Sequence, residues 1–163
     1  MNVVFQALVV IVLAIITWQD FKMRAIHIGL PIALGIIGIL NFYKKGYHTS
    51  ILLYNIIFLG LTFTGLYMYM MIKNKKWNYN LSEVIGLGDI LFFMSVLPYF
   101  STYNYILFFI TGMVFSILGF LLLKFLVQTE LVPLAGLLAI YMMLLLMIDQ
   151  WFNYDLVHFN SHL

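Results

Sequence analysis

Residues 103–127, YNYILFFITGMVFSILGFLLLKFLV, form a long apolar run with one charged side chain, Lys124. A helix that crosses the hydrocarbon core of a bilayer needs about 20 consecutive, mostly apolar residues. This run is long enough to do so. It therefore predicts a membrane-spanning helix.

Five further segments are similarly apolar, at residues 2–19, 26–42, 49–72, 84–100 and 131–148. We expect helices because an isolated strand cannot satisfy its backbone in lipid, and because the alternating pattern of a membrane barrel is absent. The first segment lacks a basic n-region and a small-residue cleavage site, so it is expected to be a retained span. The sequence thus predicts an all-α, polytopic transmembrane bundle of about six spans, with one domain over 1–148 and a short tail at 149–163.

The composition supports lipid as the solvent. Of 163 residues, 64% are hydrophobic and 9% are charged, whereas a soluble domain carries about 25% charged residues. The absence of cysteine excludes disulfides, a thiolate nucleophile and cysteine-ligated metals. The few Lys and Arg are scattered and form no basic stripe for nucleic acid. We expect no metal, no cofactor and no nucleic-acid partner.

Positive charges indicate the orientation in the membrane. Short loops rich in Lys and Arg stay in the cytoplasm. With six spans, the first, third and fifth connections share one side, and the opposite side carries only Lys44 and Lys45. This distribution predicts a plasma-membrane protein with both termini outside. The cytoplasmic set is Lys22, Arg24, Lys73, Lys75, Lys76 and Lys124.

Two aspartates reach the same predicted membrane face. Asp20 ends the first span, and Asp89 lies early in the fourth, about one or two turns inside its helix. An acid within a span usually faces the bundle interior and needs a partner. Two adjacent carboxylates tend to share one proton, which supplies a general base for water and a general acid for a leaving amine. Asp20 and Asp89 are therefore candidate catalytic residues of an aspartic peptidase.

Glycines precede the second aspartate, at Gly86 and Gly88. Glycine lets another backbone approach closely, so these positions are candidates for binding an extended substrate strand. The alternative is that they only pack helices, as small residues commonly do in membranes. Glu83 and Glu130 are predicted on the same face, as solvated loop residues or as contacts for a basic leader.

Three motifs carry a resemblance to a known family. Residues 86–89 (GLGD) match the GxGD signature of intramembrane aspartyl peptidases. Residues 20–26 (DFKMRAI) resemble the first aspartate motif of the type IV prepilin peptidase family, and residues 132–136 (VPLAG) resemble its proline-containing motif at the last span. The resemblance covers the chain in order and spacing. The family often has Pro followed by Asn or Asp after the first motif, where this chain has His27 and Ile28.

The resemblance implies catalytic roles for Asp20 and Asp89. It also implies a substrate: a prepilin-like protein whose short basic leader is removed at the cytoplasmic membrane face. Large members of the family carry a cytoplasmic insert with paired cysteines, linked to N-methylation of the product. This chain has neither feature. We therefore expect an endopeptidase without methyltransferase activity.

Two other functions remain open from the sequence. The chain could be a small transporter or channel subunit that uses Asp89 for proton or cation passage, because acids within membranes mark such routes. It could also be a structural assembly subunit with an incidental GxGD. The zinc-protease pattern HExxH and the serine elbow GxSxG are both absent. Because Asp20 and Asp89 are both predicted at the same membrane face, we favour a catalytic role over transport.

Overall fold

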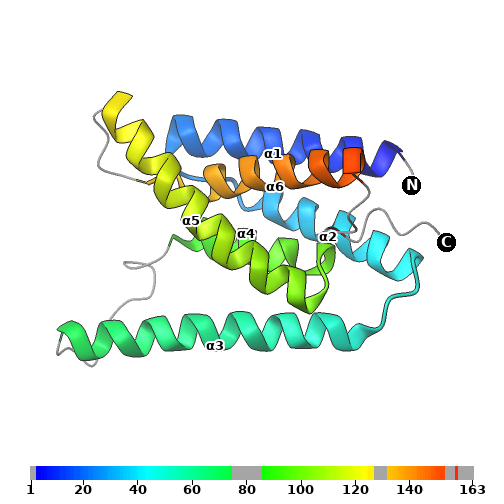
Figure 1. Cartoon of the computed structure of the whole chain (residues 1–163), viewed down its shortest axis with the longest axis horizontal. Helices are drawn as coiled ribbons and strands as arrows, with labels where there is room; N and C mark the ends of the chain where they lie inside the picture. Colours follow the sequence, from blue (N-terminus) through cyan, green and yellow to red (C-terminus); the bar gives the residue numbers. More distant parts are fainter. Residues whose placement is uncertain (1–2, 75–85, 127–131, 153–156, 158–163) are drawn as a thin grey trace.

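The computed structural model describes residues 3–74, 86–126, 132–152 and 157. Within these ranges the chain is all-helical and has no strand, which confirms the predicted fold class. Successive helices run in alternating directions, so the start of α1 and the end of α6 lie at one end of the bundle (Figure 1). The elements are α1 (Val3–Met23), α2 (Gly29–Lys44), α3 (Thr49–Asn74), α4 (Leu87–Val96), the 3₁₀ turn η2 (Leu97–Tyr99), α5 (Thr102–Leu126) and α6 (Leu134–Phe152).

Four of these helices, α1, α3, α5 and α6, are long and apolar enough to cross a membrane, while α2 and α4 with η2 are shorter apolar helices. Large apolar side chains cover the outer surface of the bundle, among them Leu61, Leu122 and Trp151. Soluble monomers rarely expose apolar patches of this extent, because water penalises them. The chain is therefore a membrane protein.

Most predicted boundaries shift by a few residues in the structure, and three of these shifts matter for the site and the tail. α1 continues to Met23, so Asp20 lies inside its last turn and does not end it. α4 begins only at Leu87, because Gly86 is non-helical at φ −59° and ψ 136°, and Asp89 therefore lies in the first turn. The tail predicted from residue 149 is wrong over its first four positions, which belong to α6. Burial of Asp149, 1% exposed, keeps the helix packed there.

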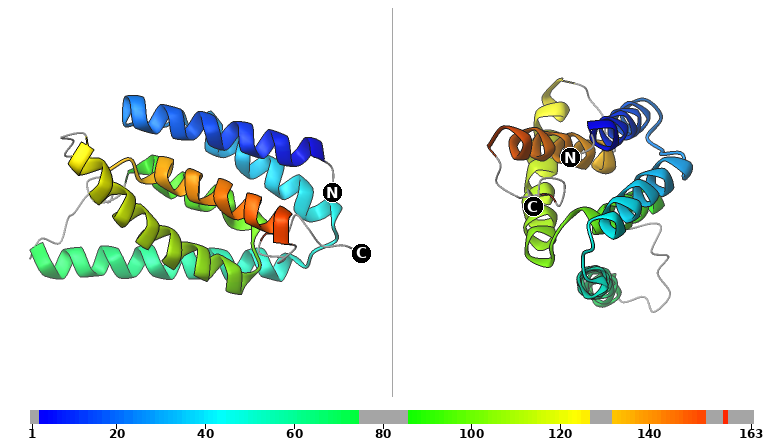
Figure 2. Two further views of the ribbon diagram at one scale, coloured as in Figure 1. Left: turned by 45° about the horizontal axis from the view of Figure 1, so that its top comes forward. Right: turned by 90° about the vertical axis from the view of Figure 1, so that its right-hand side faces the viewer.

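α4 is central and α3 is peripheral. α1 and α6 form the most extensive helix pair, and α4 packs against α2 (Figure 2). Glycines on α5 make room for α6: a Cβ at Gly112 or Gly119 would come within 2.9 Å of the Leu138 or Leu137 side chain, respectively. Small residues allow this close approach of helices in membranes, where packing takes the place of the hydrophobic effect.

The short helix α4 ends inside the bundle, where its last carbonyl groups have no helical partners. Each unsatisfied backbone group in an apolar environment costs several kcal/mol. Asn55 of α3 donates from Nδ2 to the carbonyl oxygens of Leu97 and Phe100, each at 3.1 Å. The Tyr105 hydroxyl of α5 donates to the Phe93 carbonyl oxygen at 3.0 Å. These side chains hold α4 in place, and with it Asp89.

Pro98 and Tyr99 belong to the 3₁₀ turn η2 that follows α4. The Tyr99 hydroxyl donates to the Leu34 carbonyl oxygen of α2 at 2.7 Å. Gly38 permits this contact, since a Cβ there would lie 2.5 Å from the Tyr99 ring and 2.6 Å from Pro98. Because Gly38 has no side chain, α2 can pack directly against the turn at the end of α4.

We expect Gly38→Ala to destabilise the folded protein by about 1–3 kcal/mol, because the added methyl group forces η2 away from α2. Gly60→Ala is the matched control, since nothing lies within 4 Å of a Cβ at that position. The control should be neutral or stabilising by up to about 1 kcal/mol through helix propensity. Thermal unfolding in detergent measures both. A midpoint for Gly38→Ala at or above that of Gly60→Ala contradicts the packing described.

Candidate active site

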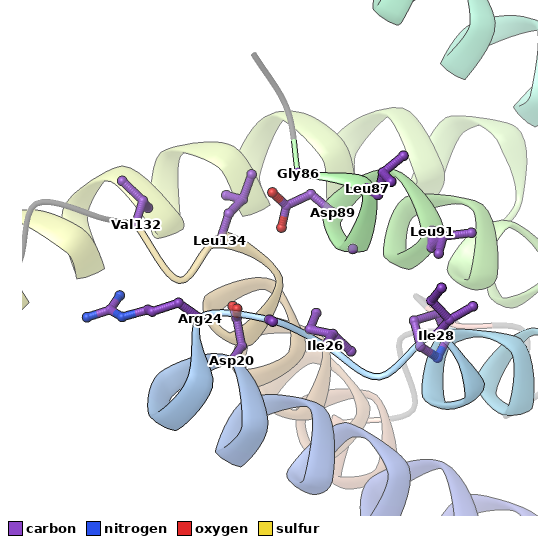
Figure 3. A pocket seen from close by; sticks show the side chains of 13 residues that line it. Asp20, Arg24, Ile26, Ile28, Gly86, Leu87, Asp89, Leu91, Val132 and Leu134 are labelled. Atoms are coloured by element: carbon purple, nitrogen blue, oxygen red, sulfur yellow. The ribbon is translucent and has the colours of Figure 1, made fainter. Parts of the chain in front are cut away.

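The two predicted aspartates meet at one end of the bundle. Asp20 comes from the last turn of α1 and Asp89 from the first turn of α4. Because α1 and α4 run in opposite directions, the end of one helix lies beside the start of the other. Their carboxyl groups point into the same space (Figure 3). This end is opposite to the start of α1 and the end of α6 (Figure 1).

Both side chains line a cavity of about 720 Å³. Its walls come from the ends of α1 and α4, from the connection between α1 and α2, and from the start of α6. Sites for small ligands usually measure about 300–1,000 Å³. The cavity is therefore large enough to admit a segment of peptide chain beside the two carboxyl groups.

Asp20 is fixed by the start of α6. Its side chain is 7% exposed, and its Oδ2 accepts a hydrogen bond of 2.6 Å from the backbone N–H of Gly136. N–H groups in the first turn of a helix lack helical partners, and the helix dipole favours an anion there. A Cβ at Gly136 would lie 3.1 Å from the same oxygen and 3.0 Å from the Phe21 ring. A glycine is therefore needed where α6 meets the carboxylate.

Asp89 faces the start of α6, at the backbone N–H group next to that of Gly136. Its carboxylate is half-buried and interacts with the backbone N–H groups of Ala135 and Gly86. The Asp20 carboxyl group is close enough to interact with it electrostatically. Consecutive N–H groups of α6 thus face the two acids, one to each. The starts of α4 and α6 both direct their positive dipole ends at the pair.

Arg24 adds a cation to the rim of the cavity. It lines the cavity, interacts electrostatically with Asp20, and closes α1 with a hydrogen bond from its N–H to the Asp20 carbonyl oxygen at 3.1 Å. Its φ is 54°, and a left-handed backbone costs a non-glycine residue roughly 1–2 kcal/mol. The sequence had indicated only a role in topology for this side chain. The structure also places it beside the acid pair.

The two glycines of the GLGD motif line the cavity but face different neighbours. A Cβ at Gly86 would lie 3.0 Å from Oδ2 of Asp89, so any side chain there would crowd the carboxylate. A Cβ at Gly88 would lie 3.4 Å from the Ile26 side chain, an ordinary packing contact. Gly88 therefore packs against the connection between α1 and α2. Glu83 and Glu130 lie outside the described residues.

Gly136 belongs to the VPLAG motif, but no separate role was predicted for it. The signal that could have found it is a helix start directly after Pro133, which places free N–H groups at the following positions. Among the described residues, no group of three or more His, Asp or Glu side chains could hold a metal ion.

No family model, no curated protein and no solved structure matches this chain. The geometry of the cavity and the three motifs that surround it are therefore the basis for assigning a function.

We expect the cavity to be open to water-soluble reagents. The chain has no cysteine, so a single introduced thiol reports its own position. Ala25→Cys, exposed on the cavity wall, should react readily with a charged maleimide in the folded protein. Ala139→Cys, fully buried in α6, should react only after unfolding. Equal rates at the two positions in the folded protein count against an open cavity.

Proposed function

We propose that this protein is an intramembrane aspartyl endopeptidase that uses Asp20 and Asp89 to activate water. One observation carries the proposal: two carboxylates that are far apart in the sequence line a single cavity at one end of a membrane-embedded bundle. Acids are costly within membrane proteins and are usually functional where they persist.

The chemistry follows from the pairing of the two acids. One carboxylate accepts a proton from a water molecule while the water oxygen attacks the carbonyl carbon of the peptide. The other, protonated, acid donates its proton to the amide nitrogen as the C–N bond breaks. The hydrogen bond from the Gly136 N–H holds the Asp20 carboxyl group in position during these transfers, and the neighbouring Ala135 N–H interacts with Asp89. This step requires no metal and no cofactor.

The proposed substrates are prepilin-like proteins, of the type IV pilin or pseudopilin class, which lose a basic N-terminal leader. The three motifs that carry the resemblance to the type IV prepilin peptidase family all contribute to the cavity: residues 20–26, 86–89 and 132–136. Two carboxyl groups at its centre also suit a basic leader. We propose peptidase activity without methyltransferase activity, since the chain lacks cysteine.

We place the site on the cytoplasmic side of the plasma membrane. Lys22, Arg24, Lys73 and Lys124 lie at the end of the bundle that carries the aspartates. Lys44 and Lys45 lie at the other end, and Lys75 and Lys76 fall outside the described residues. The excess of positive charge at the aspartate end supports a cytoplasmic orientation, with both termini outside.

Transport through Asp89 is the weaker alternative. A proton or cation route needs polar groups along its length. Between the aspartates and the far end, most of the side chains buried in the described bundle are apolar, such as Phe92, Leu138 and Met142. The buried polar ones are few: Asn41, Asn55, Ser95, Ser116 and Asp149. Asp20 and Asp89 therefore lie in an open cavity at one end of a mostly apolar core, which suits chemistry better than passage.

We expect Asp20→Asn and Asp89→Asn each to lower cleavage of a co-expressed prepilin-like substrate by at least about 10²-fold, because each removes one proton-transfer group. Asp149→Asn is the control, since Asp149 is a buried aspartate, 1% exposed, that lies at the other end of α6. Gel mobility of the substrate measures leader removal. Persistent cleavage in both site variants refutes the acid pair. Ion flux without any cleavage favours a transporter.

The proposed orientation predicts opposite labelling at the two ends of the bundle. Ser50→Cys, exposed at the start of α3, should react with a membrane-impermeant maleimide in intact cells. Ile28→Cys, exposed on the cavity wall, should be protected until the membrane is opened. The reverse pattern means that the aspartates face the outside.

A further inference from the structure

α3 packs against the bundle through only half of its length. Asn55 and Leu59 are buried, but no side chain from Gly60 to Lys73 is buried. The helix lies at the edge of the molecule, beside α4 and α5, in all views (Figures 1 and 2). Its loosely packed half is the half that extends toward the end with the aspartates.

The other half of α3 is firmly anchored. Asn55 is fully buried and holds the carbonyl oxygens of Leu97 and Phe100. One turn later, the ring of Phe58 packs edge-on against Tyr105 and Phe109 of α5, with centroids 6.0 Å and 5.7 Å apart. α3 is thus firmly anchored at one end and less tightly packed at the other, where the Phe63 ring contacts Phe93 of α4 with centroids 6.3 Å apart.

A second cavity, of about 450 Å³, lies between the loosely packed half of α3 and the rest of the bundle. Thr62, Phe63 and Leu66 of α3 face Phe93 of α4 and Phe109 and Met113 of α5 across it. We call this cavity the α3–α5 cleft. Of the described residues that line it, only Asp89 is charged, and Asp89 and Leu134 also line the larger cavity. The two cavities therefore meet at Asp89.

We propose that the α3–α5 cleft is the docking site for the apolar transmembrane helix of the substrate, which moves in sideways from the bilayer. This inference rests on the proposed peptidase function and adds the membrane-embedded half of its binding site. The substrate helix packs in the cleft. The extended chain before it crosses Asp89 and continues into the larger cavity, where the basic leader meets the acid pair.

Three observations favour this occupant over a lipid. Among the described residues that line the cleft, none is basic and so able to hold a phosphate, and the charged one, Asp89, is an acid. It lies between α3 and α5, which are long enough to cross the bilayer, so a third helix can lie along them. Helices associate in membranes through packing and not through hydrophobicity, and the unfilled aromatic wall supplies packing surface. The extended segment then emerges at Asp89.

Photo-crosslinking tests the docking site without any need for turnover. A photoreactive side chain replaces Leu66 in the cleft, or Ile36 on the exposed face of α2 as a control, each in the Asp20→Asn protein in liposomes. The probe is a synthetic peptide with a short basic leader followed by one apolar transmembrane helix. We expect several-fold more peptide adduct at Leu66 than at Ile36. Adducts with lipid alone, or equal adducts at both positions, overturn the proposal.

A reversible crosslink tests whether the cleft is used during cleavage. Leu66→Cys with Met113→Cys, joined by a short thiol-cleavable crosslinker, closes the cleft. Gln6→Cys with Gln150→Cys is the control, since that hydrogen-bonded pair joins α1 to α6 far from the site. Closing the cleft should abolish cleavage of the membrane peptide, and reduction should restore it. Cleavage of a short soluble leader peptide should continue unchanged.

Each outcome of the crosslinking experiment decides the docking proposal. Loss of the membrane substrate alone supports the α3–α5 cleft. If cleavage of both substrates is lost, the crosslink acts on the acid pair and not on a bound transmembrane helix. If cleavage of neither substrate is lost, the cleft is not used. Either result overturns the docking proposal. If the reduced protein cleaves nothing, the proposed peptidase function fails. The adduct yields at Leu66 and Ile36 still decide whether a transmembrane helix binds the cleft.

Discussion

Backbone groups at helix ends inside an apolar bundle must find partners, and this constraint organises the whole molecule. The short helix α4 leaves carbonyl groups that Asn55 and Tyr105 satisfy, which ties α3 and α5 to it. The start of α6 leaves N–H groups that meet Asp20 and Asp89, which ties α1 and α4 to it. Each polar contact thus fixes a helix that apolar packing alone would leave free to slide.

Asp20 and Asp89 therefore have a structural role, as acceptors at the start of α6, as well as the proposed catalytic role. A helix start needs only a neutral acceptor, and Ser, Thr or Asn satisfies it without burying a charge. Two carboxyl groups that repel each other, beside an open cavity, are a costly way to cap one helix. The cost is consistent with chemistry that requires acids. The capping contacts then serve to hold both acids in a fixed geometry before substrate binds.

The sequence predicted the helices and the meeting of the acids, for a topological reason. Apolar runs define spans, and alternating spans bring the end of the first and the start of the fourth to one face. What the sequence could not predict depends on tertiary contacts. The shortness of α4 is possible only because Asn55, far away in the chain, satisfies its end. The need for Gly136 depends on how closely α1 approaches α6. Burial of Asp149 extends α6 past an apparent charged boundary.

The bundle divides into a fixed part and a loose part, and the division follows from the same polar contacts. α1, α4 and α6 meet at the acid pair, where a hydrogen bond from Gly136 fixes Asp20 and the Ala135 N–H interacts with Asp89. α3 is joined only at Asn55, at the far end, and nothing polar in its described second half holds it to the bundle. The proposed peptidase function requires rigid catalytic groups and a wall that can move to admit a large substrate. Placing the one strong anchor of α3 far from Asp89 provides both in a chain of 163 residues.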